Sequence, residues 1–449
     1  MKQPHLAWIF KQQIMKLKIF FLSAVLAAFG QFGCKDFVDG INEDPNNAPD
    51  ASLDVVLQAA MVSTIVVHEG EDARLAALWA RQFTGSDRQY SGYEIYNVVS
   101  NDWNWDKNYI IIKNADIVIE KAAVENNKLA SGIAKVLKAH TFGKMTSLWG
   151  DVPFSEAAKF PEITDPKFDD QMAVYQGIQQ LLDEAVSDLS GGPTNAAVAA
   201  KDFFFGGDAA AWEAVANTLK ARFYLHVGDY ANAAASANKG IADPSGDWLA
   251  PHPQGNFTLD MNMWFDFGQI NRFGYMTANG AILPALLDPA STTYRGNAKT
   301  DEAARFNFVY VGTSPDYDLN YDAMWAANAS YPLVTSLENH LILAEAEWRQ
   351  GNTAAALDAL NAARADLAAL FPDGTYEAYE MADFAEGGIA GRPGESAEDA
   401  LLHEILEEKY ASLVGQIEVF NDLRRTDNYL GLPPTTGSAF PERFLISQD

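Results

Sequence analysis

Apolar residues recur every three or four positions through most of the sequence, which is the spacing of one face of an α-helix. The first such series follows Ser52, a predicted N-cap, and consists of Leu53, Val56, Leu57, Ala60 and Met61. A second predicted helix contains Leu75, Leu78, Trp79 and Phe83. Further helices are predicted from Trp105 through Asp116 and from Ser131 to Trp149, before Gly150 and Pro153. The periodicity therefore predicts a mostly α protein.

Two segments match the spacing of a tetratricopeptide repeat, in which small residues let the two helices of a pair approach closely. The matching positions of the first are Trp212, Leu219, Tyr224, Gly228, Tyr230, Ala233, Ala237 and Pro244. Those of the second are Ala344, Gly351, Ala355 and Ala359. We therefore expect a helical repeat array, with repeats within about residues 105–244 and 333–427.

Helical periodicity fades between these regions, over residues 245–332. Glycine, proline, asparagine and aromatic residues dominate there, as in MNMWFDFGQINRFGYM at 261–276. Long irregular segments on a rigid scaffold commonly carry binding groups. We therefore predict that this insertion forms an irregular, loop-rich half that faces a ligand.

The N-terminus has the pattern of a bacterial lipoprotein signal. Lys16 and Lys18 precede an apolar run that leads to Gly33 and Cys34, the only cysteine. From residue 19 to residue 33 the run has 15 residues, fewer than the roughly 20 that a membrane-spanning helix needs. We predict a signal peptide over residues 1–33, with 1–14 an upstream mis-start, followed by a lipidated tether at 34–51 and a folded domain at 52–449. A small buried cysteine is the alternative.

The net charge of the chain limits the classes of partner that it can bind. The leader holds four of the 32 basic residues and none of the 60 acidic ones, so the remaining 416 residues carry a net charge of −32. Such a surface repels nucleic-acid phosphates and anionic membranes, and we expect direct binding to neither. No cysteine remains to form a disulfide, so stability depends on the apolar core. Aromatic residues make up 12% of the chain, and tryptophan and tyrosine stack on sugar faces as well as filling cores.

Several motifs, taken in order, resemble the SusD/RagB family of nutrient-binding outer-membrane lipoproteins. They are NEDPNNAP at 42–49, SLWGDVPFSEA at 147–157, LILAEAEWRQGN at 341–352 and EEKYASLVGQIEVFNDLRRTD at 407–427, with the closing PERFLISQD. The resemblance implies four tetratricopeptide-like helix pairs beside an irregular ligand-binding half. It also implies capture of oligosaccharides, or of peptides in the RagB branch, for a SusC-like TonB-dependent outer-membrane transporter. Lys35, Asp36 and Asp39 resemble a surface-export signal of Bacteroidetes lipoproteins, which implies a lipid anchor and exposure at the cell surface.

The sequence shows little sign of catalysis, and we expect a protein that is not an enzyme and needs no cofactor. His403 and Glu404 lack the second histidine of a zinc-protease helix. No phosphate loop, dinucleotide fingerprint or nucleophile elbow is present. Acidic residues are too numerous for their spacing to reveal a glycosidase pair. An extracellular glycan hydrolase is therefore the alternative from another class.

For ligand contact we favour the segment that leads into the helix at Trp105. Arg88, Trp103, Trp105 and Asn108 resemble, in type and spacing, the glycan-binding residues of starch-binding family members. In an extended segment Trp103 and Trp105 point to the same face and form a platform. Alternatively, Trp105 and Tyr109 bury one face of a helix. Trp264 and Trp325 of the insertion are further candidates, and the sequence does not distinguish a glycan from a peptide.

Alternating oxygen-bearing side chains suggest calcium at one position. Asp316, Asp318, Asn320 and Asp322 resemble the start of an EF-hand loop, but Tyr321 and Ala327 replace its glycine and its bidentate glutamate. A structural calcium site of another kind and a solvated acidic loop are both open, and the pattern favours the loop.

Overall fold

The computed structural model describes residues 51–99, 105–191, 195–256 and 260–445. The chain divides into two units, Met1–Ser52 and Leu53–Asp449, and the fold below is that of the second. The predicted signal peptide, the tether with Cys34, and Trp103 lie outside the described residues.

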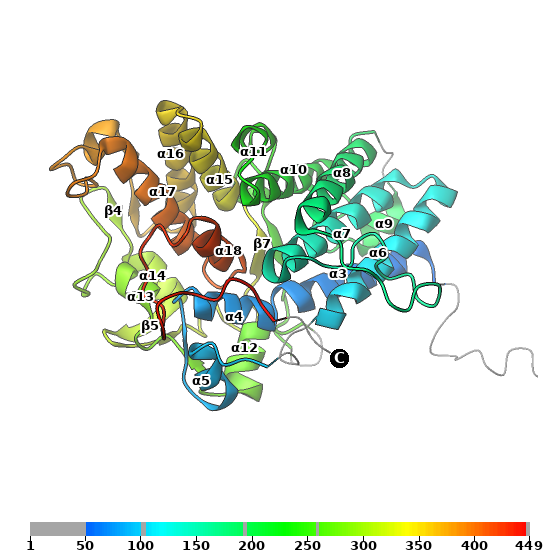
Figure 1. Ribbon diagram of the computed structural model, residues 1–449, viewed down its shortest axis with the longest axis horizontal. Coiled ribbons are helices and arrows are strands. Elements are labelled where there is room, and N and C mark those ends of the chain that lie inside the picture. The colour runs from blue at the N-terminus through cyan, green and yellow to red at the C-terminus, as the bar shows by residue number, and fades with distance from the viewer. Residues whose placement is uncertain (1–50, 100–104, 192–194, 257–259, 446–449) are drawn as a thin grey trace, which may run out of the picture. The chain divides into compact units, whose positions relative to one another are not determined.

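Helices account for most of the regular structure, which confirms the mostly α prediction (Figure 1). In chain order they are α3 (Leu53–His68), α4 (Glu71–Trp79), α5 (Arg88–Glu94), α6 (Trp105–Glu125), α7 (Lys128–Trp149), α8 (Gln171–Leu189), α9 (Ala196–Lys201), α10 (Ala209–His226), α11 (Tyr230–Ala237), α12 (Met263–Phe265), α13 (Ile282–Leu287), α14 (Ala303–Val309), α15 (Ser336–Arg349), α16 (Thr353–Leu370), α17 (Ala397–Ser412) and α18 (Glu418–Arg425). Shorter turns of helix are η2 (Pro244–Gly246), the π-helical η3 (Asp266–Asn271) and η4 (Met381–Phe384).

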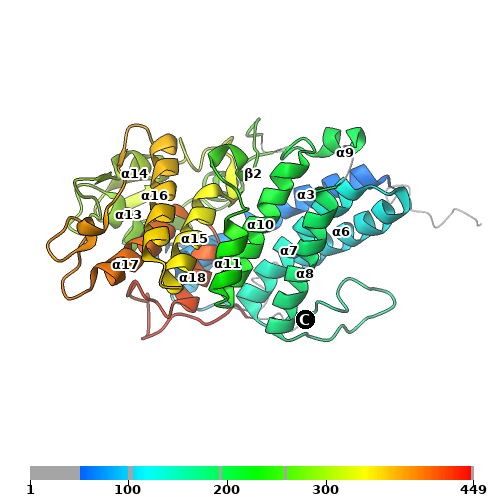
Figure 2. The same ribbon diagram turned by 90° about the horizontal axis from the view of Figure 1, so that it is seen from above.

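The two predicted repeat units are the helix pairs α10–α11 and α15–α16, which lie side by side (Figure 2). Each pair turns at a glycine with positive φ, Gly228 at 73° and Gly351 at 82°, a conformation that glycine adopts without a steric penalty. α11 packs against α15 and thereby joins the two units. One position differs from the prediction, because Ala355 is exposed and its neighbour Ala356 is buried between the helices.

The array continues on both sides of these pairs. α6 packs on α7, α7 on α8 and α8 on α10, while α17 packs against α15. Aspartate or hydroxyl side chains cap several of the helices: the Asp208 carboxylate accepts from two amides of α10, and Thr335 and Ser396 cap α15 and α17. Such caps satisfy amides that have no partner inside the helix.

α4 ends earlier than the sequence predicts. Its last residue is Trp79, and Arg81 adopts the left-handed conformation with φ of 64°. The Gln82 amide then donates to the Ala77 carbonyl at 3.0 Å and closes the turn. Phe83 therefore enters the core from a loop, although it lies at helical spacing from Trp79.

The residues between α11 and α15 form short helices and strands, and the strands of the unit pair as two-stranded antiparallel sheets, some with a partner outside this region. The strands are β1 (Thr84–Gly85), β2 (Trp248–Ala250), β3 (Met276–Thr277), β4 (Thr300–Asp301), β5 (Tyr310–Thr313), β6 (Asp316–Leu319), β7 (Tyr331–Val334) and β8 (Thr375–Tyr376). They pair as β1–β3, β2–β7, β4–β8 and β5–β6. Of these pairs, β1–β3 and β4–β8 join the irregular half to segments outside it, whereas β2–β7 and β5–β6 lie within that half or at its edge.

Buried ion pairs also hold the irregular half to the helices. Arg295 contacts Glu404 at 2.8 Å and Glu408 at 2.9 Å, both on α17. Arg305 of α14 contacts Glu408 at 2.7 Å. Because removing one partner from a buried pair leaves an uncompensated charge, this cluster makes the two parts mutually dependent.

Candidate functional site

The predicted contact Arg88 lies where two distant segments meet. Gly85 of β1 pairs with Met276 of β3, and the Ser86 amide donates to the Tyr275 carbonyl at 2.9 Å. The Asp87 carboxylate then accepts from the Arg88 amide and begins α5. These bonds place the start of α5 beside the loop that connects η3 to β3.

That loop exposes apolar side chains next to arginines. Phe273 is 77% exposed and Ile270 is 51% exposed, while the Arg88 side chain is 71% exposed. The Arg272 guanidinium carbon lies 5.8 Å from the centre of the half-buried Tyr275 ring. We call Arg88, Ile270, Arg272, Phe273 and Tyr275 the α5–β3 surface. It combines aromatic faces with guanidinium donors, the groups that bind sugar rings or peptide side chains.

Buried side chains pack on the inner side of this surface. Tyr90 of α5 lies 4.8 Å from Phe267 of η3, between ring centres, and its hydroxyl accepts from Arg74 Nε at 3.2 Å. The Arg74 guanidinium lies 4.3 Å from the Phe267 ring centre. Burial raises the pKa of the Tyr90 hydroxyl, so this phenol stays neutral. The π-helical turn η3 starts in this layer, and such turns are frequent at functional sites.

The other predicted contacts near Trp105 face protein. Trp105 is half-buried and packs edge-on against Trp149 at 5.2 Å and Tyr109 at 5.8 Å, while its ring stacks parallel to Phe168 at 6.2 Å. This packing agrees with the alternative in which Trp105 and Tyr109 bury one face of a helix. Asn108 is fully buried, and its Nδ2 donates to the Trp105 carbonyl at 3.1 Å. Asn108 therefore holds the first turn of α6 and does not face a ligand.

Trp264 and Trp325 also lie in the core, with 1% and 0% of their surface exposed. Trp325 Nε1 donates to the Val309 carbonyl at 2.9 Å. A ligand arriving from solvent cannot stack on either ring, and the expectation that they contact one is corrected accordingly. The sequence predicts ligand contact in the segment 261–276 through Trp264 and not through Phe273 or Tyr275. The signal that favours Phe273 is its place beside Gly274 in a stretch without helical periodicity.

A groove of about 790 Å³ lies next to these elements, between α3 and the segment from Pro251 to Asn271. Val62 and Val66 of α3, together with Phe203, form its apolar wall, and Asp260 and Asp266 line its other side. No lysine or arginine is among the described residues that line it. The groove is thus apolar and acidic, which suits an apolar ligand that carries positive charge.

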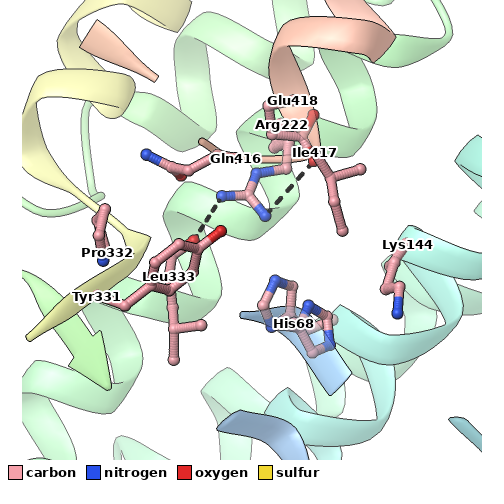
Figure 3. Close-up of a pocket in the computed structure, with 10 residues that line it drawn as sticks. His68, Lys144, Arg222, Tyr331, Pro332, Leu333, Gln416, Ile417 and Glu418 are labelled. Atoms are coloured by element: carbon pink, nitrogen blue, oxygen red, sulfur yellow. Dashed lines mark hydrogen bonds and ion pairs between the residues drawn. The ribbon is translucent and has the colours of Figure 1, made fainter. Parts of the chain in front are cut away.

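A second, much smaller cavity is buried where α3, α7, α10, β7 and α18 meet (Figure 3). His68 and His140 stack there with ring centres 3.8 Å apart. Burial lowers the pKa of both imidazoles well below their usual value, so both are neutral. His68 Nε2 and His140 Nδ1 have no hydrogen-bond partner among the described residues. At about 20 Å³ the cavity has room for roughly one water molecule, and we assign it a structural role.

The acidic series near residue 316 lies on the hairpin β5–β6. Asp316 and Asp318 belong to β6, and Asn320 Oδ1 accepts from the Asp322 amide at 3.0 Å. Within the described residues, no group of three or more histidine, cysteine, aspartate or glutamate side chains is arranged to hold a metal ion.

Comparison with known proteins places the chain in a family. A family model described as "Starch-binding associating with outer membrane" matches residues 45–444. A SusD/RagB family protein from Bacteroides thetaiotaomicron VPI-5482 has a similar structure, with a TM-score of 0.66 and 22% identity, covering 89% of this chain and 93% of its own. A SusD homologue from Bacteroides fragilis NCTC 9343 has a TM-score of 0.66 and 18% identity, covering 88% and 93%.

A chitin-binding SusD homologue from Flavobacterium johnsoniae is also similar, with a TM-score of 0.62 and 15% identity, covering 84% of this chain and 87% of its own. No curated protein matches the sequence. The structural likenesses show the fold, and the family model covers most of the chain, as the sequence motifs predict. The chain therefore belongs to the SusD/RagB family, and its SusD-like model is that of starch-binding proteins that associate with the outer membrane.

Proposed function

We propose that this protein is a lipid-anchored, non-catalytic binding protein that captures oligosaccharides at the cell surface and delivers them to a SusC-like TonB-dependent outer-membrane transporter. The observation that carries the proposal is the α5–β3 surface, where the exposed Phe273 and Arg88 lie on two segments that β1–β3 joins, in a member of this family. The acyl anchor is placed on Cys34 by the sequence pattern that precedes it.

The chemistry of the α5–β3 surface suits a sugar. An exposed aromatic face packs against the C–H face of a pyranose, and guanidinium groups donate hydrogen bonds to hydroxyl oxygens. Phe273 and Ile270 are both exposed close to the exposed Arg272, and exposed apolar side chains that cluster beside polar ones are typical of binding surfaces. Trp103 is proposed as a further contact on sequence grounds alone.

A peptide is the second candidate ligand. The groove between α3 and the segment from Pro251 to Asn271 favours it, because Val62, Val66 and Phe203 offer an apolar wall opposite Asp260 and Asp266. A peptide with apolar and basic side chains matches this combination better than a neutral glycan does.

Titration calorimetry against a panel of chito-, malto- and xylo-oligosaccharides and of basic peptides tests the proposal. Saturable binding of an oligosaccharide that is lost in Phe273→Ala supports it. Binding of peptides without binding of any oligosaccharide supports a peptide as the ligand instead. Release of new reducing ends from a bound glycan contradicts the non-catalytic assignment.

A further inference from the structure

A pocket of about 250 Å³ opens between α7, α8, α10 and α18, away from the elements of the α5–β3 surface. Arg424 and Arg425 of α18 and His226 of α10 line it on one side. Gln171, Met172 and Tyr175 of α8 line it on the other. No aspartate or glutamate is among the described residues that line it. In a chain with 60 acidic and 32 basic residues, a pocket with cations and without carboxylates is unusual.

Two of these three side chains already have a carboxylate partner. Arg425 contacts Glu345 at 2.7 Å through Nη1 and Asp422 at 2.7 Å through Nε. His226 Nε2 lies 2.8 Å from Glu418 Oε2. These two side chains therefore contribute little uncompensated charge to the pocket.

Arg424 is different, because its bonds go to neutral acceptors. Nη2 donates to the Ser147 carbonyl and to Asn421 Oδ1, and Nη1 donates to the Glu442 carbonyl. Within the described part of the chain it forms no ion pair, and its buried Nε has no hydrogen-bond partner. Burial lowers the pKa of Arg424 to about 10, and the nearby Arg443 adds to the effect, while Tyr175 and Glu418 oppose it. The fold thus buries a guanidinium charge that no carboxylate contacts directly within the described residues and that Glu418 offsets only in part, which has a desolvation cost.

We propose that this pocket binds a small oxyanion, either a carboxylate or a phosphate, with Arg424 as its charge partner. A guanidinium attracts both groups and donates charge-assisted hydrogen bonds to them. After the three bonds above, one Nη1–H of Arg424 remains to donate to a ligand, because the Nε–H is buried. A bound oxyanion offsets the charge that the protein leaves uncompensated. The carboxylate of an acidic sugar and a free or ester-linked phosphate share this chemistry, and the inference does not depend on the proposed oligosaccharide site.

Calorimetric titration of the detergent-extracted full-length protein tests the inference, with inorganic phosphate and D-glucuronate as probes at constant ionic strength. We expect both the wild type and the control Ala173→Glu to bind at least one probe with equal affinity. Ala173 is exposed on α8 and does not line the pocket, whereas the exposed Met172 next to it does. Met172→Glu adds a negative charge to the pocket without removing any bond of Arg424, and we expect about tenfold weaker binding or more.

Arg424→Gln is the second variant, because it removes the charge. Its titration is interpretable when its circular dichroism spectrum matches that of the wild type, which shows that the variant folds. Tighter binding of D-glucuronate than of phosphate identifies the carboxylate as the physiological group, and the reverse identifies the phosphate. Absence of binding by either probe overturns the proposal. Equal affinity of the wild type and Met172→Glu does so as well, because the binding then occurs elsewhere.

Discussion

Trp264 and Trp325 lie face to face, with ring centres 4.4 Å apart and planes inclined by 27°. Phe83 packs against both rings at 5.2 and 5.7 Å. A side chain at Gly415 would meet the Trp325 ring at 2.6 Å, so the backbone of the segment between α17 and α18 closes over the stack. The two tryptophans thus join the irregular half to the helical half through the core.

Trp325→Ala is expected to destabilise the protein by about 3–5 kcal/mol, because it removes a large buried ring and leaves a cavity. Urea denaturation measures the change. Phe160→Ala is the matched control, since Phe160 is 72% exposed on the loop between α7 and α8, and we expect its effect to stay within about 0.5 kcal/mol. A Trp325→Ala variant as stable as this control would contradict the core assignment.

The His68–His140 stack predicts loss of stability in acid. Burial lowers the pKa of both side chains in the folded state, so below about pH 6.5 the unfolded chain binds more protons than the folded one. The free energy of unfolding therefore falls as the pH drops from about 7 to 5, with a slope from this pair of up to about 2.7 kcal/mol per pH unit.

His68→Gln removes one of these protonation sites, and the slope is expected to fall by about half of the pair's contribution. The measurement is urea denaturation of both proteins over this pH range. Asp247, whose pKa is raised to about 7 by burial, contributes a pH dependence of the opposite sign to the free energy of unfolding. This contribution is the same in both proteins, so it cancels when their slopes are compared. Identical slopes for the variant and the wild type would show that the histidine stack does not control acid stability.

Cys34→Ala is expected to release the protein from the membrane fraction. Each buried methylene of an acyl chain contributes about 0.8 kcal/mol to membrane attachment, and the variant has no thiol to acylate. Fractionation with immunoblotting measures the release, and mass spectrometry of the wild-type N-terminal peptide detects the acyl groups. Unchanged retention of the variant, with no acylated peptide in the wild type, would refute the anchor.

Mild detergent extraction is expected to recover the protein together with a large TonB-dependent barrel. Specific protein interfaces bury more than about 1,000 Å² in total, which is enough for a complex to survive affinity purification. The measurement is mass spectrometry of proteins that co-purify with the tagged chain. Recovery of the tagged chain alone, from an extract in which the barrel is present, would contradict the delivery role.

The helical half follows from the sequence because its signals are local. The spacing around Gly228 and Gly351 marks the turns of the two repeat units, and the structure has α10–α11 and α15–α16 there. The end of α4 is less predictable, because Phe83 fits the helical period while the turn at Arg81 contacts residues distant in sequence, such as Ile282, whose amide donates to the Arg81 carbonyl at 2.8 Å.

The site is harder to predict than the helices, because exposure in the irregular half depends on long-range pairing. Trp264 and Trp325 look like candidates for ligand contact in the sequence, but Phe83 and the loop at Gly415 pack against them in the core. Arg88 and Phe273 are 185 positions apart, and long-range contacts such as the β1–β3 pairing bring their segments together. No periodicity in the sequence encodes that pairing.

The most direct test of the central claim is the affinity of the α5–β3 surface for an oligosaccharide, measured by calorimetry on the wild type, Phe273→Ala, Arg88→Ala and the control Phe160→Ala. We expect Phe273→Ala to weaken binding by about 1–3 kcal/mol, the loss of an aromatic anchor, with an unchanged melting temperature. Phe160→Ala is expected to bind like the wild type, because its equally exposed ring lies on another loop. Wild-type affinity in both Phe273→Ala and Arg88→Ala would contradict the assignment of the oligosaccharide site to this surface.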